Sequence, residues 1–159
     1  MSKRANLYLG RAGQMAVMAE FLARGLNVAI PEVDVGDDIF VVHDKEGEFW
    51  RIQVKTATVQ ERVYGYSAQY NVPLSQLTVP FTPELSYVFV ARRNQRWESF
   101  IVINRDVLQE EHKIYNVGSL TKDNKLMLRF KFSEAKVTCS DRDFTPYLNN
   151  WDKWPVIEH

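Results

Sequence analysis

Residues 30–56 constrain the fold of this chain more than any other part of the sequence. An acidic turn ends at Asp38 and leads into the apolar run of residues 39–42, and a second strand-like run reads IQVKT. Side chains alternate between the two faces of a sheet, so Gln53 and Lys55, two positions apart, project from the same face. An acid, an amide oxygen and an amine that converge on one face can hold a divalent cation beside a phosphate. The pattern therefore predicts a sheet with a cation-dependent phosphate site.

Helix and strand patterns fill the rest of the chain. Residues 11–24 are rich in strong helix formers, and Gly25 is placed to end that helix. Residues 60–84 hold several tyrosines and prolines without a sustained period, which predicts a partly extended excursion with one short helix near 74–77. Strands are expected at 27–30, 38–42, 49–59, 85–91, 97–103, 126–132 and 135–139, and a helix capped by Asn104 at 105–113.

This order of elements predicts the α/β class in its mixed α+β form, with a central mixed β-sheet flanked by helices. No internal repeat, low-complexity tract or linker divides the chain, so residues 1–159 are expected to form one domain. Trp151 and Trp154, three positions apart, are expected to anchor a core or an interface rather than to contact a ligand.

Charge and cysteine content narrow the class of protein. Twenty basic and twenty acidic residues cancel, which argues against a protein that coats nucleic acid by its total charge. The acids are clustered, because residues 31–48 hold seven of them against the single Lys45. The one cysteine, Cys139, agrees with a reducing compartment, and the sequence shows neither an apolar run of about 18 residues nor a secretory signal at its start. We expect a cytoplasmic protein that does not enter a membrane.

The segment GQMAVMAEFLARGLNVAIPEVDVGDDIFVV, followed by WRIQVKT, resembles the PD-(D/E)XK nuclease superfamily, which has the restriction-endonuclease-like fold. The similarity is to the branch whose last motif reads QxK, which includes group I intron-encoded homing endonucleases and small bacterial PD-(D/E)XK proteins. Its specificity lies in the order of the parts: a helix that ends in RG, a short strand to a proline, a turn that ends in Asp, and a strand with QxK. The resemblance covers about residues 10–57, roughly a third of the chain.

The resemblance implies a role for each motif residue. Asp38 would bind a metal ion, Gln53 would supply an oxygen ligand, and the main-chain oxygen of Val54 would complete the metal shell. Lys55 would orient or activate the attacking water and stabilise the pentavalent phosphate. The implied metal is Mg²⁺, with Mn²⁺ as a substitute, and the implied substrate is DNA.

One motif position departs from the family pattern. Members place a Glu on the first helix, in a GE pair about a dozen positions before the RG, and this chain has Gln14 there. Glu20 lies six residues further on, which turns it about 120° around the helix, so a surface pair with Arg24 explains it better. Asp34 and Asp37 lie on a turn long enough to aim either carboxylate toward the site. With so few carboxylates, metal binding is expected to be weak until a phosphate arrives.

Outside the motif, four residues are candidates for contact with nucleic acid. Arg92, Arg93 and Arg96 lie at an expected turn between two strands, where they could grip a phosphate backbone or form an ordinary solvated turn. Tyr66 could stack on a base or pack within its own loop. Both interpretations stay open for each of them.

Three functions are compatible with these observations. The first is a Mg²⁺-dependent DNA endonuclease that hydrolyses phosphodiester bonds by metal-assisted attack of water. Cutting both strands needs two sites, which would require a homodimer or a higher homo-oligomer. The second is a catalytically attenuated nuclease-fold module that binds DNA or a protein partner, and Gln14 favours it. The third is an interaction subunit without a role on nucleic acid.

Overall fold

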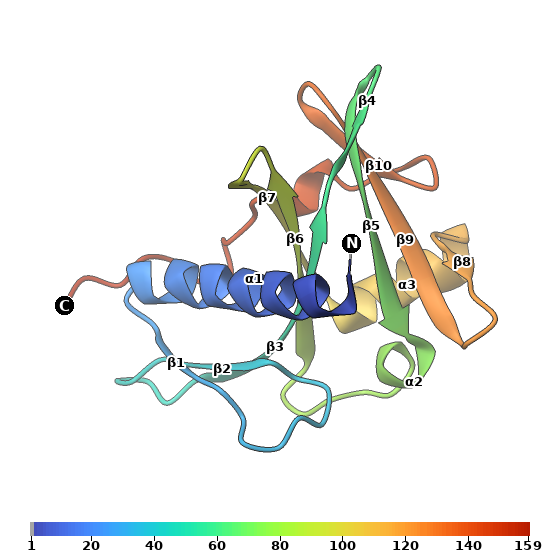
Figure 1. Ribbon diagram of the computed structural model, residues 1–159. Helices are drawn as coiled ribbons and strands as arrows, with labels where there is room; N and C mark the ends of the chain where they lie inside the picture. Colours follow the sequence, from blue (N-terminus) through green and yellow to red (C-terminus); the bar gives the residue numbers. More distant parts are fainter. Residues whose placement is uncertain (1) are drawn as a thin grey trace.

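The computed structural model describes residues 2–159, and the strands of this region form two sheets (Figure 1). Across the first sheet lie, in order, β1 (Asn27–Ala29), β2 (Ile39–Val42), β3 (Phe49–Thr58), β6 (Leu85–Arg93) and β7 (Arg96–Asn104). The central strands β3 and β6 run parallel, and the other neighbours run antiparallel. The expected central mixed sheet flanked by helices is therefore confirmed.

Strand β6 is buried on both faces, and its alternating side chains belong to two different cores. Val88 and Val90 pack in one cluster with Phe21 of the long helix α1 (Lys3–Ala23), which crosses the first sheet (Figure 1). Tyr87 and Phe89 belong to a second cluster, which the second sheet and α3 (Arg105–Tyr115) complete. The continuous apolar run of this strand follows from its position between two covered faces.

The second sheet is antiparallel and lies beside the first (Figure 1). Its strands β9 (Lys125–Ser133) and β5 (Gly65–Pro73) form the long central pair, and β8 (Ser119–Leu120) pairs with β9. The order across the sheet is β11 (Arg142–Asp143), β10 (Lys136–Cys139), β9, β5 and β4 (Gln60–Arg62). The short helix α2 (Leu74–Leu77) follows β5 at the place where the sequence predicts it.

The partly extended excursion predicted for residues 60–84 is in its first part a pair of regular strands, which the prediction does not include. Strands β4 and β5 form a hairpin there, and β5 pairs with β9 along its whole length. Ala68, Tyr70 and Val72 point into the core while Gln69 and Asn71 are exposed, which is the alternation of a half-buried strand. The tyrosines and prolines that surround this segment obscure a period of two.

The start of the first helix and the capping of α3 differ from the prediction. Helix α1 begins at Lys3 instead of residue 11, because the side chain of Ser2 accepts a hydrogen bond from the main-chain nitrogen of Ala5 at 3.1 Å and caps the helix. Asn104 does precede α3, but its side chain makes no capping bond. It accepts instead from Ser86 of β6 at 3.0 Å and from Lys153 of the C-terminal segment at 3.2 Å.

The C-terminal segment closes the core under α1. Residues Thr145–Tyr147 form a single 3₁₀ turn, and the rings of Trp151 and Trp154 pack edge-on against Phe21 with centroids 5.5 and 4.9 Å away. The expected anchoring role of both tryptophans is confirmed, and it is in the core. No helix within residues 2–159 has the length and apolar character needed to cross a membrane.

Candidate active site

The site is built where the acidic loop meets β3. The main-chain nitrogen of Asp38 donates to the carbonyl of Ile52 at 2.8 Å, which attaches the end of the loop to the strand. The Oδ2 atom of Asp38 then accepts from Nε2 of Gln53 and from the main-chain nitrogen of Val54, both at 2.8 Å. These three bonds fix the carboxylate against the motif strand. The Oδ1 atom has no hydrogen-bond partner among residues 2–159, so it is available to a cation.

Gln53 and Lys55 share one face of β3, as the spacing predicts. In the parallel register they lie opposite Tyr87 and Phe89, whose side chains point toward the second sheet. The neighbouring Val54 belongs to the cluster under α1. The two polar side chains therefore project into the space between the sheets, where Gln53 is buried and Lys55 is half-buried.

Burial shifts both ionisable groups of the motif toward their neutral forms. The pKa of the Asp38 carboxyl is raised above its usual value, chiefly by desolvation, although the Val54 hydrogen bond and the charge of Lys55 oppose the shift. The pKa of the Lys55 amine is lowered, again chiefly by desolvation, and Asp38 opposes that shift. Each charge thus stabilises the other in a site that is poor in water, which is typical of functional sites.

Gln14 reaches the same site from α1. Its Nε2 donates to the main-chain oxygen of Asp38 at 2.9 Å, and its Oε1 accepts from Arg11 at 2.9 Å. Gln14, at the position where the family that the motif resembles has a Glu, therefore adjoins Asp38, but its side chain directs Nε2 toward the site. The predicted pair between Glu20 and Arg24 is not among the ion pairs of residues 2–159, and Arg24 donates instead to the carbonyl of Trp154 at 3.3 Å.

The acids next to Asp38 are occupied by other partners. Asp37 is buried and forms an ion pair with Arg51 at 2.8 Å, so it braces the loop on β3. Asp34 is exposed and accepts from the main-chain nitrogen of Gly36 at 3.0 Å. Within residues 2–159 no three His, Cys, Asp or Glu side chains gather around one point, so a cation at this site would depend on one carboxylate and on neutral oxygens. Oxygen donors of this kind suit Mg²⁺ and Mn²⁺.

Two residues of the site come from segments that the motif does not include. Gln76 of α2 donates to Oε1 of Gln53 at 3.3 Å. Lys125 of β9 lies near enough for its charge to lower the pKa of Lys55 further. No local signal marks either residue, because their approach depends on how the second sheet docks against the first.

The arginine cluster and Tyr66 lie elsewhere. Arg92 pairs in register with Thr58, five residues along β3 from Gln53, which is roughly 16 Å. Its guanidinium lies 4.4 Å from the centroid of the Trp97 ring, and Arg96 is exposed.

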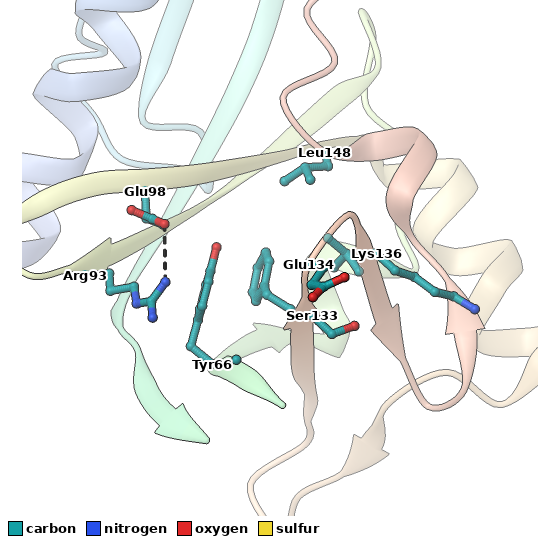
Figure 2. Close-up of a pocket in the computed structure, with 10 residues that line it drawn as sticks. Tyr66, Arg93, Glu98, Ser133, Glu134, Lys136 and Leu148 are labelled. Carbon is teal, nitrogen blue, oxygen red and sulfur yellow. Dashed lines mark hydrogen bonds and ion pairs between the residues drawn. The ribbon is translucent and has the colours of Figure 1, made fainter. Parts of the chain in front are cut away.

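Tyr66 is enclosed on both faces of its ring. Arg93 lies 4.5 Å from the ring centroid, and Phe132 stacks on the ring at 4.5 Å. Figure 2 shows Arg93 beside Tyr66 and directed toward Glu98. All three residues line a pocket of about 220 Å³. Arg93 also pairs with Glu61 at 2.8 Å. The structure thus places Arg93 and Tyr66 in a local polar cluster apart from Asp38. Contact with nucleic acid stays a prediction for all four residues.

Comparison with solved structures supports the fold. A bacterial homing endonuclease, I-Ssp6803I, matches with a TM-score of 0.56 over 91% of this chain and 87% of its own, at 19% sequence identity. The two chains therefore share a fold. No protein-family model and no curated protein sequence matches the chain.

Proposed function

We propose that this protein is a DNA endonuclease of the PD-(D/E)XK type that hydrolyses phosphodiester bonds with the help of Mg²⁺. The observation that carries the proposal is the convergence of Asp38, Gln53 and Lys55 on one half-buried site, with the Asp38 carboxylate fixed by two hydrogen bonds. The shared fold with a protein described as a homing endonuclease supports it.

Each side chain has a separate task in the proposed reaction. Asp38 would hold the cation through Oδ1, helped by oxygen from Gln53 and from the main chain of Val54. Bound Mg²⁺ would lower the pKa of a coordinated water and neutralise charge on the phosphate. Lys55 would orient that water while it carries its charge and would stabilise the additional negative charge on the phosphate in the transition state. A homodimer or higher homo-oligomer would supply the two sites needed to cut both strands.

A catalytically attenuated module that binds DNA or a protein is the second candidate. It is favoured by the chemistry of the two glutamines, because Gln14 and Gln53 both direct nitrogen toward Asp38. A single carboxylate gives a divalent ion less electrostatic stabilisation than two would.

Cleavage of plasmid and branched DNA with Mg²⁺ and with Mn²⁺ tests the first candidate. Asp38→Ala and Lys55→Ala should each lower the cleavage rate by about 10²–10⁴-fold, since both remove electrostatic stabilisation of the transition state. Lys45→Ala, at the exposed hairpin between β2 and β3, is the matched control and should cut like the wild type.

The outcomes separate the candidates. Loss of cleavage in Lys55→Ala with DNA binding retained would support the endonuclease. Cleavage that persists in Asp38→Ala would contradict the assignment of the site. A folded wild type that binds DNA but does not cut it under either metal would favour the attenuated module, and salt-dependent binding would distinguish it from a protein without a role on nucleic acid.

A further inference from the structure

Gln76 makes two hydrogen bonds through a single atom. Its Nε2 donates to the main-chain oxygen of Gly36 at 2.5 Å and to Oε1 of Gln53 at 3.3 Å. Its own Oε1 is buried and has no hydrogen-bond partner among residues 2–159. Gln53 in turn donates through its Nε2 to Asp38. A series of amides thus links the acidic loop, α2 and the motif strand.

The two ends of this series fix the direction of both amides. A main-chain carbonyl can only accept, so Gly36 requires the nitrogen of Gln76 to face it. The Nε2 of Gln76 is a donor, so the Gln53 atom that faces it must be the acceptor oxygen. The Nε2 of Gln53 then faces Asp38. Turning Gln53 alone would set two NH₂ groups against each other. Turning Gln76 as well would set its oxygen against the carbonyl of Gly36.

A glycine makes the approach of Gln76 possible. Gly36 has φ of +110°, which side-chain-bearing residues rarely adopt, and a Cβ atom there would lie 2.9 Å from Nε2 of Gln76. The loop therefore lets Gln76 come close to its main chain.

We propose that Gln76 is a positioning residue that holds the Gln53 amide with its nitrogen toward Asp38. The hydrogen bond between Gln76 and Gln53 must break, and the Gln53 amide must turn, before the Gln53 oxygen can face a cation at Asp38. The orientation of the Gln53 amide is a property of the metal-free protein, whereas its effect on cation binding rests on the proposed function. Gln76 accordingly opposes cation binding in the free protein and favours the hydrogen-bonded form of Asp38.

Gln76→Leu tests the proposal, because it keeps the size of the side chain and removes the donor. Side-chain amide resonances of Gln53, recorded by NMR without metal, should shift and show exchange between two orientations. Mn²⁺ binding to the free protein should tighten about fivefold, the effect of one neutral hydrogen bond that no longer has to break. Gln69→Leu, at an exposed position on β5, is the matched control and should change neither readout.

A second variant tests the direction of the effect. Gln76→Glu offers only acceptors, so Gln53 should turn its nitrogen toward the new carboxylate and its oxygen toward Asp38, and Mn²⁺ should bind more tightly than in Gln76→Leu. Unchanged Gln53 resonances, or weaker Mn²⁺ binding, in both variants would overturn the proposal. A wild type that binds no Mn²⁺ would count against the proposed function, while the metal-free resonances would still decide the role of Gln76.

Discussion

At the scale of the residue, Asp38 is held where its ionised form is disfavoured. Desolvation raises its pKa above the usual value of about 3.9, and the nearby carboxylates of Asp34 and Asp37 raise it further. The Val54 hydrogen bond and the charge of Lys55 reduce the shift without cancelling it. The ionised carboxylate that a cation requires is therefore disfavoured in the folded, metal-free protein.

Asp38→Asn should raise the free energy of unfolding at neutral pH. The folded wild type binds the Asp38 proton more tightly than the unfolded chain does, so this group contributes stability at low pH that is lost as pH rises through its folded pKa. The substituted amide keeps an oxygen for the Gln53 and Val54 bonds without the charge. Urea unfolding across pH checks this, and the advantage of the variant should shrink as pH falls. An advantage that does not depend on pH would contradict the argument.

Gln14→Glu should make stability depend on metal. The new carboxylate cannot donate to the main-chain oxygen of Asp38, so the metal-free protein should lose about 1 kcal/mol. Added Mn²⁺ should recover part of the loss, because the site gains a second carboxylate. Thermal melts with and without Mn²⁺ measure both effects. Gln14→Leu, which removes the donor without adding charge, should show the loss and no recovery.

At the scale of the element, the position of α1 depends on a close contact with β3. A Cβ atom at Gly13 would overlap the side chain of Thr56 and would lie 2.7 Å from its Cγ2. The next residue is Gln14, so this contact sets how closely the helix brings Gln14 to Asp38. Gly10, on the same helix, has open space where a Cβ would be.

Gly13→Ala should therefore destabilise the protein by about 1–3 kcal/mol, because the helix must move away from β3. Gly10→Ala is the matched control and should stabilise by up to about 1 kcal/mol through helix propensity alone. Chemical denaturation of both variants checks the difference. Equal effects at the two glycines would show that α1 does not depend on close packing at Gly13.

The motif could be predicted from the sequence because its parts are local. A strand alternates faces by geometry, so the shared face of Gln53 and Lys55 follows from their spacing. The direction of the Gln53 amide does not follow, because Gly36 and Gln76 determine it from other segments. The strand β5 was missed for a different reason, since its alternation is short and lies among residues typical of loops.

At the scale of the whole molecule, the second sheet is part of one body with the first. Phe89 of β6 packs against Tyr70 and Phe130 of the second sheet, with ring centroids 5.1 and 5.4 Å away. Phe144, from the C-terminal segment, packs on Phe130 at 5.4 Å. That residues 1–159 form one domain stays a prediction, and a sequence pattern carries no information on which strands from distant segments share a core. Lys125 and Gln76 reach the site only because of this docking.

Phe130→Ala tests whether the two cores unfold together. Phe130 is fully buried in the cluster between the sheets, so its truncation should cost about 3–5 kcal/mol. All four tryptophans of the chain belong to the other cluster, under α1 and along β7. Their fluorescence therefore reports on a core that does not contain Phe130.

If the sheets form one cooperative unit, the tryptophan transition and the loss of far-UV circular dichroism should shift together to lower denaturant concentration. Loss of the dichroism signal before the fluorescence changes would show that the second sheet unfolds on its own. In that case the positions of Gln76 and Lys125 would depend on a separate equilibrium, and the candidate site would be complete only while both sheets are folded. Coincident transitions would instead mean that the two sheets unfold as one unit, so that the site is complete whenever the protein is folded.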